Sequence, residues 1–262
     1  MTQAFRLSAN ISMLFPELPF PERVAAAASA GFRAVECQFP YAFAAREIAA
    51  RVADAGVVMN GITTPPGDPA RGESGFAAIR GRTAEFRRGF EEALEYGRKL
   101  GVSTIHVMSG VPSGGDAGAA RDTFLENLAW ASEGARDAGV TLLIEPLNSR
   151  DRPGYFVSRS DAVADLLRAL DRDNVRMLFD IYHVQIMEGD ILTRLGRHWP
   201  LIGHAQIASV PGRHEPDEGE IAFAAVLAEL AARGWSGFVG AEYNPRGPTL
   251  DGLGWARPWL AP

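Results

Sequence analysis

The segment VRMLFDIYHVQIMEGD, residues 175–190, is the stretch on which an interpretation of the fold depends. A strand-like apolar run over 175–179 ends abruptly at Asp180, and a stretch of helical character follows Tyr182 and His183. A carboxylate at the end of a buried strand is costly unless it has a partner. The order of strand, polar residue and helix therefore predicts a functional group at the end of one α/β unit.

The same order recurs along the whole chain. Eight apolar runs rich in strand-forming residues occupy 5–13, 32–39, 57–63, 103–110, 140–148, 175–182, 201–209 and 237–244. Apolar positions at helical spacing lie between and after them, at 19–32, 42–55, 81–100, 121–138, 158–171, 190–199, 221–233 and 249–260. Eight such alternations predict an α/β fold of the (β/α)8 TIM barrel type, with residues 1–262 forming a single domain.

A doubly wound open sheet is the alternative arrangement of the same elements. That fold more often carries a glycine-rich phosphate-binding turn after its first strand, and the segment SANISMLFPELPF, residues 8–20, contains none. Several helical segments instead end in a glycine directly before the next strand, as in DAGV and KLGV. The Pro- and Gly-rich segments 64–80 and 110–118 are predicted to be loops over the mouth of the barrel.

Composition limits the classes of partner. The chain has 262 residues, is 47% hydrophobic and carries a formal net charge of −6, which argues against a nucleic-acid partner. No apolar run approaches the ~18 residues of a membrane span, so no membrane partner is expected. Cys37 is the single cysteine, and the opening MTQAFRLSAN lacks the features of a signal peptide. These features predict a cytoplasmic protein that acts on a small molecule.

Each of the last four predicted strands ends in an oxygen-bearing side chain. These are Glu145, Asp180, Gln206 and Glu242, spaced about one strand–helix repeat apart. In a barrel, the carboxyl ends of the strands face one shared cavity. Any single acid here has a simpler explanation, as a helix cap or the partner of an arginine. Four in register favour a common site.

Three carboxylates converging in one cavity would repel each other, and a divalent cation would resolve that cost. Three carboxylates and an amide oxygen form an all-oxygen set, which suits Mg²⁺ or Mn²⁺. Such a cation acidifies a C–H bond beside a carbonyl group and stabilises the resulting enediolate. Glu145 and Glu242 come from non-adjacent strands, so they can flank a substrate as general base and general acid. This chemistry serves ketose–aldose isomerisation or epimerisation.

The chain resembles the hydroxypyruvate isomerase family, within the wider group of xylose isomerase-like barrels that also includes ketose 3-epimerases and endonuclease IV. The resemblance extends nearly from end to end, over 8–41, 93–110, 142–148, 173–190, 203–221 and 240–255. Its most specific part is GHAQIASVPGRHEPDEGEI (203–221) followed by EYNPRG. It implies a metal held by Glu145, Asp180, Gln206 and Glu242, with the two glutamates as the proton-transfer pair.

Two substrate-binding residues follow from the same resemblance. His183 matches a histidine that touches substrate oxygens in related epimerases, and Arg213 matches a loop arginine near the substrate. Arginine offers a carboxylate a planar pair of donors. His183 could instead cap the next turn, and Arg213 could pair with Glu215 or Glu218.

Other features refine the choice within this group. Related epimerases carry a histidine where this chain has Gln206, and the glutamine favours an isomerase. His204 is interpreted as a core residue or a support of the site, and Glu36 has no implied metal role. Asn244 replaces a lysine that family members often carry, and this difference predicts a changed hydroxy-acid preference if the position contacts the substrate. The five histidines of the chain are too few for the multi-zinc site of the endonucleases.

We therefore expect a metal-assisted isomerase that interconverts hydroxypyruvate and tartronate semialdehyde through an enediolate. The alternatives are a 2-oxo-tetronate isomerase or ketose 3-epimerase, an inosose dehydratase-like lyase, and a non-catalytic sugar binder. A homo-oligomer is possible, with Trp235 or the segment GWARPWL (254–260) as candidate contacts.

Overall fold

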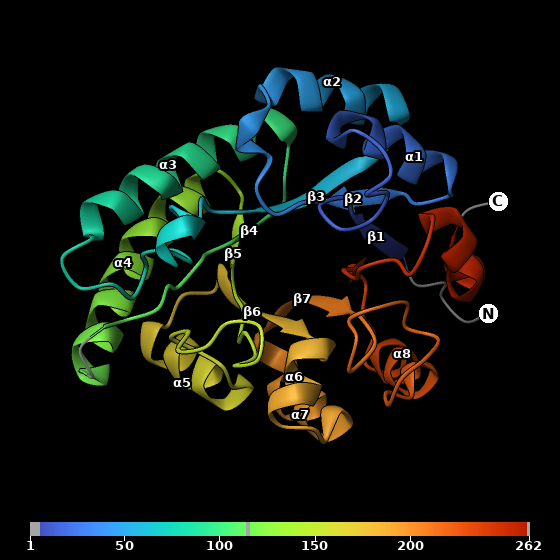
Figure 1. The fold of residues 1–262 in the computed structure, drawn as a ribbon. Coiled ribbons are helices and arrows are strands. Elements are labelled where there is room, and N and C mark those ends of the chain that lie inside the picture. Colours follow the sequence, from blue (N-terminus) through green and yellow to red (C-terminus); the bar gives the residue numbers. More distant parts are fainter. Residues whose placement is uncertain (1–5, 114–115, 261–262) are drawn as a thin grey trace.

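Eight parallel strands form a closed barrel in sequence order (Figure 1). The computed structural model describes residues 6–113 and 116–260, so the first residue of predicted strand 5–13 and the middle of predicted loop 110–118 lie outside the described residues. The strands are β1 (Arg6–Asn10), β2 (Ala34–Glu36), β3 (Val58–Thr63), β4 (Thr104–His106), β5 (Thr141–Ile144), β6 (Val175–Asp180), β7 (Ile202–Ile207) and β8 (Phe238–Ala241).

The barrel closes between its first and last strands. β8 pairs in parallel with β1, with Leu7 opposite Val239 and Ala9 opposite Ala241. The predicted (β/α)8 barrel is confirmed, and each of the eight predicted runs contains one strand. The predictions extended several strands too far. The run 175–182 overran because Asp180 ends β6 and its carboxylate accepts the Tyr182 N–H at 2.9 Å, which begins a helix at Ile181.

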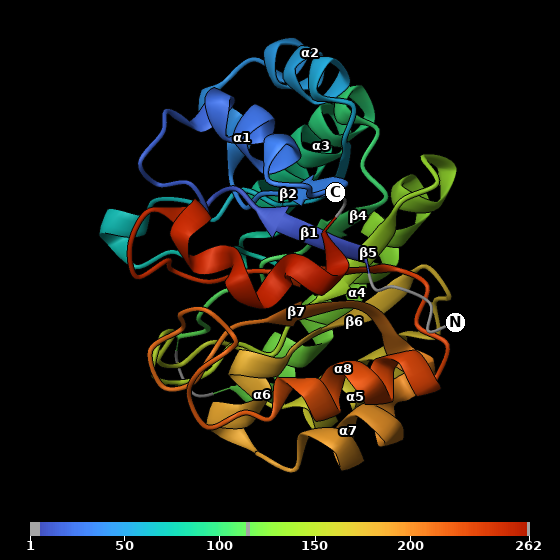
Figure 2. The same cartoon turned by 90° about the vertical axis from the view of Figure 1, so that its right-hand side faces the viewer.

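Helices surround the barrel, as Figures 1 and 2 show from two directions. They are α1 (Arg23–Ser29), α2 (Ala45–Ala55), α3 (Thr83–Leu100), α4 (Ala117–Asp137), α5 (Ser160–Leu170), α6 (Ile181–Met187), α7 (Ile191–His198) and α8 (Phe223–Ala232). The predicted last helix is a 3-10 helix, η5 (Thr249–Trp259). Shorter 3-10 turns are η1 (Phe20–Glu22), η2 (Pro40–Ala42), η3 (Pro69–Arg71) and η4 (Trp199–Leu201).

Glycines end two of the helices as predicted. Gly56 after α2 and Gly101 after α3 both adopt the left-handed conformation, at φ 66° and 68°. Residues with a Cβ adopt this conformation at a cost, so glycine suits these positions. The chain can then turn directly from each helix into the next strand.

The strands are buried on both faces, as expected of a parallel barrel covered by helices. Leu178 and Asp180 share one face of β6, and His204 and Gln206 share one face of β7. Leu178, His204 and Gln206 line the cavity inside the barrel, which identifies these as the inward faces. The alternation of side chains thus places polar groups inside the barrel and leaves Met177 and Phe179 to pack against the surrounding helices.

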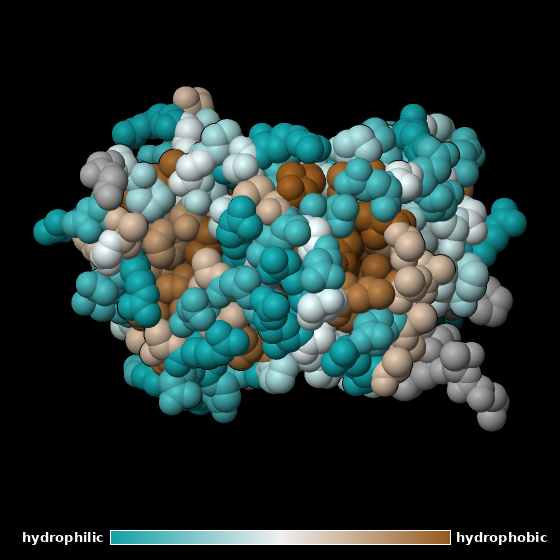
Figure 3. Space-filling model, turned by 90° about the horizontal axis from the view of Figure 1, so that it is seen from below, coloured by the Kyte–Doolittle hydropathy of each residue, from teal (hydrophilic) through white to brown (hydrophobic). Residues whose placement is uncertain are grey.

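The outer surface bears on the membrane and oligomer expectations. Among the described residues, no helix is long and apolar enough to cross a membrane. Figure 3 shows one face of the molecule, on which hydrophobic residues gather in separate patches divided by hydrophilic ones. Trp235 packs edge-on against Trp199, with 5.8 Å between ring centroids, and Trp255 packs against Tyr243. These tryptophans therefore have intramolecular partners, and a role in a homo-oligomer stays a prediction.

Candidate active site

A cavity of about 430 Å³ opens inside the barrel at the carboxyl ends of the strands. Glu145, His183, Gln206, Arg213 and Glu242 line it. Asp180, the remaining predicted site residue, is fully buried behind these side chains. The structure therefore gathers the residues that the sequence places at the ends of the last four strands, together with both predicted substrate-binding residues.

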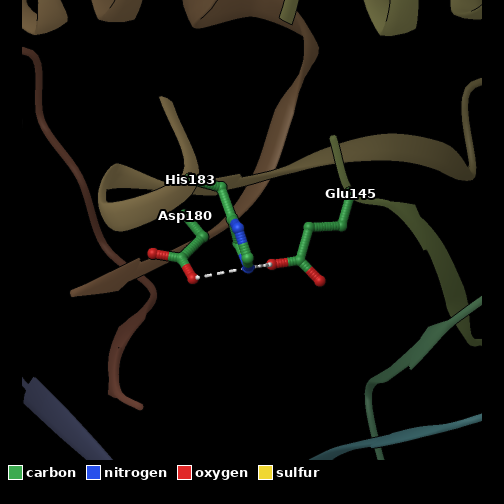
Figure 4. A group of neighbouring side chains, drawn as sticks. All are labelled: Glu145, Asp180 and His183. Atoms are coloured by element: carbon green, nitrogen blue, oxygen red, sulfur yellow. Dashed lines mark ion pairs between the residues drawn. The ribbon is translucent and has the colours of Figure 1, made fainter. Parts of the chain in front are cut away.

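Glu145, Asp180 and His183 form a compact buried group (Figure 4). One ligand atom from each lies within 4.8 Å of the others. His183 Nε2 is 3.7 Å from a carboxylate oxygen of Glu145 and 3.6 Å from one of Asp180. Glu145 directly follows β5, Asp180 ends β6 and His183 lies in the first turn of α6, so two successive barrel units build the group.

The hydrogen bonds of His183 decide which of its ring nitrogens carries the proton. Nδ1 accepts the backbone N–H of Asn148 at 3.1 Å, and the side-chain nitrogen of Asn148 lies 2.7 Å away. The Asn148 side-chain oxygen accepts the N–H groups of Arg150 and Asp151, which fixes its NH₂ group toward the ring. A neutral His183 thus carries its proton on Nε2. That nitrogen is a donor, which suits contact with substrate oxygens better than metal ligation.

Glu242 lies among donors on another side of the cavity. Its Oε1 accepts the side-chain amides of Asn10 and Gln38, both at 2.8 Å, and its Oε2 accepts an N–H of Arg213 at 2.7 Å. Asn10 ends β1, and Gln38 follows β2. These strands are the next two around the barrel from β8, so the closing of the barrel brings the three side chains together.

Arg213 connects Glu242 with the group formed by Glu145, Asp180 and His183. Its Nη2 also contacts Asp180 at 3.4 Å, and its guanidinium lies 4.7 Å from the centre of the Tyr182 ring. Its backbone adopts φ 55°, a conformation uncommon for a residue with a side chain. The alternative that Arg213 pairs with Glu215 or Glu218 is wrong.

A different arginine explains why those glutamates do not pair with Arg213. Arg246 pairs with Glu215 at 2.8 Å and also contacts Glu218. Both ion pairs lie outside the cavity lining. The guanidinium of Arg213 is thereby left to the carboxylates inside the barrel.

Gln206 is held from below by Glu36. The Gln206 Nε2 donates to Glu36 Oε1 at 2.6 Å, and His204 Nε2 lies 2.9 Å from Glu36 Oε2. This arrangement agrees with the prediction that His204 supports the site and lies deeper in the barrel. The side-chain oxygen of Gln206 has no hydrogen-bond partner among the described residues.

Burial shifts the pKa values of the site away from solution values. Burial, reinforced by Glu242 and Asp180, raises the pKa of Glu145 well above its usual range. Burial also raises the pKa of Asp180 to about 7, against the opposing effect of Arg213, and raises the pKa of Glu242. Burial and then Arg213 hold the pKa of His183 well below its usual value. In the metal-free site, burial therefore disfavours the ionised forms of the three carboxyl groups and the protonated form of His183.

His106 lies beside Glu145. Its Nδ1 is 3.5 Å from a carboxylate oxygen of Glu145, and burial lowers the pKa of His106 to about 4. The imidazole is therefore neutral at ordinary pH. Glu145 thus lies between two uncharged histidines, His106 and His183.

The donor set fits an oxygen-preferring divalent cation. A side-chain oxygen of Glu145 and the amide oxygen of Gln206 are buried and have no hydrogen-bond partner among the described residues. Asp180 stands opposite Gln206 in the register of β6 and β7. Glu242 differs, because both of its oxygens are engaged by Asn10, Gln38 and Arg213. The fourfold ligand set stays a prediction, and a Glu/Asp/His group is what the structure contains.

The sequence analysis missed three residues of the site. Asn10 and Gln38 hold Glu242, and Asn148 sets the proton of His183. Asn10 ends its strand as Asp180 ends β6, so the rule that found the last four strand ends could have been applied to the first two. No local signal identifies Asn148, because its partner lies 35 residues away.

Comparisons with known proteins agree with this geometry. A family model described as xylose isomerase-like TIM barrel matches residues 24–260. A 2-oxo-tetronate isomerase of Cupriavidus necator is 46% identical over 256 residues, which cover 97% of this chain and 98% of that protein. A hydroxypyruvate isomerase of Escherichia coli K12 is 37% identical over 255 residues, covering 97% and 99%. A crystal structure from Brucella melitensis, described as an AP endonuclease of family 2, superposes with a TM-score of 0.96 and 44% identity, covering 98% and 99%.

Proposed function

The chain belongs to the xylose isomerase-like TIM barrel family, and from this premise we propose that it isomerises short 2-oxo acids that carry a hydroxyl group at C3. It is an isomerase, like its curated relatives. The leading substrate is hydroxypyruvate, which the enzyme interconverts with tartronate semialdehyde. The observation that carries the proposal is the pair of buried carboxyl groups, Glu145 and Glu242, that line one cavity from different sides.

The reaction moves a carbonyl group from C2 to C3. A base removes the C3 proton, the electron pair of that bond forms a C2–C3 double bond, and the C2 carbonyl becomes an enediolate oxygen. A proton is then returned to C2, while the C3 hydroxyl passes its proton to the C2 oxygen, so that C3 becomes the new carbonyl group and C2 carries the hydroxyl. The two carbon atoms therefore need one base and one acid, and a second proton moves between the two oxygens; a general acid–base group contributes ~10²–10⁴-fold to rate.

The surroundings of the two glutamates favour a division of these roles. Burial raises the pKa of Glu242, but donors from Asn10, Gln38 and Arg213 oppose this shift, which suits the base of the pair. Glu145 has an unpartnered oxygen, lies between the two neutral histidines, and has a pKa raised well above its usual range by burial. Its higher pKa makes Glu145 the readier proton donor of the two, which suits the acid.

Three further groups orient the substrate and balance its charge. The Nε2–H of His183 and the guanidinium of Arg213 are donors for the oxygens at C2 and C3 and for the substrate carboxylate. A divalent cation, Mg²⁺ or Mn²⁺, held by Glu145, Asp180, Gln206 and Glu242 would supply electrophilic stabilisation of the enediolate oxygens. The oxygen-rich donor set supports this choice of metal.

A second substrate, 2-oxo-tetronate, has a specific observation in its favour. The relative that is 46% identical is named 2-oxo-tetronate isomerase, and this acid carries the same reacting group as hydroxypyruvate with one carbon more. The cavity of about 430 Å³ has room for a four-carbon acid as well as for a three-carbon one. Asn244, which lines the cavity where family members often carry lysine, is positioned to influence this choice.

The remaining alternatives have less support. Gln206 stands where ketose 3-epimerases carry histidine, which disfavours epimerisation. Of the five histidines, His198 and His214 do not line the cavity, which disfavours a multi-zinc endonuclease site despite the description of the Brucella structure. A lyase of the inosose dehydratase type would release a chromophoric dione, and a non-catalytic binder would have no use for the paired glutamates.

Turnover of hydroxypyruvate and 2-oxo-tetronate in D₂O tests the proposal. The purified chain should isomerise one or both, lose the activity with a chelator and regain it with Mg²⁺ or Mn²⁺. Faster epimerisation of a free ketose, or release of a dione, would refute the assignment. Glu188→Gln, which changes a buried carboxylate outside the cavity, is the matched control and should turn over normally.

Two variants separate the roles of the glutamates. Glu145→Gln should still exchange the C3 hydrogen of hydroxypyruvate for deuterium while forming product at least ~10²-fold more slowly. Glu242→Gln should lose both exchange and product formation. The opposite pattern would reverse the two roles, and unchanged turnover in both variants would reject the glutamate pair.

A further inference from the structure

Glu36 is a buried carboxylate that the proposed reaction does not use. It ends β2 inside the barrel, and its two oxygens contact Gln206 Nε2 at 2.6 Å and His204 Nε2 at 2.9 Å. We propose that Glu36 is a positioning residue that fixes the side-chain amide of Gln206 with its oxygen toward the cavity, where that oxygen serves as a metal ligand. The inference rests on the proposed metal site and adds a residue that determines its donor set.

The two ends of an amide side chain differ, and Glu36 distinguishes them. An ionised carboxylate only accepts hydrogen bonds, whereas an amide presents a donor NH₂ at one end and an acceptor oxygen at the other. With Glu36 below it, Gln206 must point its NH₂ group down and its oxygen up. The oxygen is indeed buried and without a hydrogen-bond partner among the described residues. A flipped amide would face two acceptors toward each other and offer the cavity a donor, which cannot bind a cation.

The contacts of Glu36 leave its carboxyl oxygens in acceptor positions. Its Oε1 accepts the Gln206 amide N–H at 2.6 Å, and its Oε2 lies 2.9 Å from His204 Nε2. His204 is itself buried and contacts Glu36 on the side away from Gln206. The carboxylate thereby has a partner for each of its oxygens.

The barrel also leaves space for this arrangement at one position. Gly240 of β8 stands opposite Gln206 in the register of the sheet. A Cβ atom at Gly240 would overlap Glu36 Oε1 and lie 2.7 Å from Gln206 Cγ. Real Cβ contacts are not this short, so any side chain here would displace the pair. Glycine at 240 is therefore a requirement of the Glu36–Gln206 contact.

A purely structural role for Glu36 makes a different prediction. If Glu36 and His204 only fill the barrel interior, replacing Glu36 lowers stability without changing the Gln206 amide or metal affinity. The inference requires a defined amide orientation and a loss of metal affinity. Spectroscopy of the Gln206 amide and metal titration distinguish the positioning role of Glu36 from a purely structural one.

Side-chain NMR in the metal-free protein tests the orientation directly. The chain contains four glutamines, Gln3, Gln38, Gln185 and Gln206, so selective ¹⁵N labelling of the side-chain amides gives a countable spectrum, and loss of one pair of signals in Gln206→Glu assigns Gln206. We expect one Gln206 NH₂ proton to be shifted downfield and slow to exchange, and to lose both properties in Glu36→Gln. A Gln206 pair with the chemical shift and fast exchange of a solvated amide in the wild type would overturn the inference.

Mn²⁺ titration of the intact protein tests the consequence. Loss of a group that orients a metal ligand typically weakens binding ~10–100-fold, and we expect Glu36→Gln to weaken Mn²⁺ within this range. The double variant Glu36→Gln, Gln206→Glu should recover to within about threefold of wild type, because a carboxylate at 206 offers an oxygen in either orientation. Glu188→Gln is the matched control, since Glu188 is equally buried and pairs with Arg194 at 2.8 Å outside the cavity.

The outcomes are distinguishable from failure of the proposed function. If wild type binds Mn²⁺ and Glu36→Gln binds it equally well, the inference fails while the proposed metal site stands. If the double variant folds, as judged by circular dichroism, but does not recover affinity, Glu36 acts through barrel packing and the inference is again overturned. If wild type binds no Mn²⁺, the proposed metal site fails and the inference fails with it.

Discussion

Replacing Arg213 by glutamine removes the positive charge that links Glu242 and Asp180. The Arg213 guanidinium lies 2.7 Å from Glu242 and 3.4 Å from Asp180, and the arginine side chain is only 17% exposed. In Arg213→Gln, two buried carboxyl groups lose their cationic partner. Both must then remain ionised at a cost or take up protons, and either response lowers the stability of the metal-free protein at neutral and higher pH.

The size of the effect follows from the geometry. Removing one partner of a buried ion pair costs about 3–5 kcal/mol. Only the Glu242 contact is short, and Asn10 and Gln38 still solvate that carboxylate. A loss of about 2–3 kcal/mol at pH 8 is therefore expected, closer to that of one charged hydrogen bond. At about 2–4 °C per kcal/mol for a chain of this size, the melting temperature should fall by roughly 4–12 °C.

Two conditions should reduce the effect. Burial already raises the pKa values of Asp180 and Glu242, and removal of Arg213 raises them further, so protonation near pH 5 removes most of the unpaired charge. A cation that binds only the folded chain also stabilises it. Mn²⁺ should therefore raise the melting temperature of Arg213→Gln more than that of wild type.

Thermal unfolding followed by circular dichroism, at pH 5 and pH 8 with chelator or Mn²⁺, measures these effects. Arg246→Gln is the control, because Arg246 pairs with the buried Glu215 at 2.8 Å outside the cavity. That variant should show no additional Mn²⁺ response. An Arg213→Gln protein that melts like wild type at pH 8 in chelator, or that gains no more from Mn²⁺, would refute the electrostatic account of the site.

Three other changes have defined outcomes. Gly240→Ala forces a Cβ into the Glu36 carboxylate and should cost about 1–3 kcal/mol in urea unfolding, whereas Gly89→Ala in α3, with its nearest contact at 3.7 Å, should be neutral or stabilising by about 0.5–1 kcal/mol. Asn148→Asp replaces the amide donor beside His183 Nδ1 with an acceptor, which should favour a proton on that nitrogen. The variant should have a lower kcat and a higher His183 pKa, as measured by NMR. An unchanged pKa would contradict the assignment of the proton to Nε2. Burial raises the pKa of Asp180 from 3.8 to about 7, so between these pH values the folded metal-free chain binds a proton that the unfolded chain does not, and its stability should fall as pH rises. Asp180→Asn should flatten this dependence of stability on pH in denaturant titrations. An unaltered dependence would contradict the raised pKa of Asp180.

The fold and the strand-end residues are readable from the sequence because they depend on local order. Each apolar run is followed by a helical segment, several of these segments end in glycine, and Glu145, Asp180, Gln206 and Glu242 keep the spacing of that repeat. Asp180 was expected at the end of its strand, as observed, whereas the predicted run 175–182 extended two residues into α6 because the same carboxylate also caps that helix. Local pattern describes either role and does not reveal that one side chain performs both.

The contacts of Arg213 could not be predicted from the local sequence pattern. Two glutamates lie within five residues of it, and proximity in sequence favours them as partners. The loop after β7 instead turns its backbone so that Arg213 reaches Glu242, 29 residues away. The Arg213 carbonyl oxygen accepts the Asn244 N–H at 2.8 Å, which fastens this loop to the end of β8. Pairing of this kind is set by loop conformation, which has no periodic signature.

Barrel closure explains why the two proposed catalytic glutamates differ. Glu242 follows β8, whose neighbour in the closed barrel is β1, so the side chains at the ends of β1 and β2 reach it as amide donors. Glu145 follows β5, and its neighbours on β4 and after β6 are the buried histidines His106 and His183. Two carboxyl groups with the same chemistry thus receive opposite surroundings from opposite sides of one ring. An open sheet of the same strand order would leave β8 without β1, and Glu242 would lose the donors that favour its ionised form.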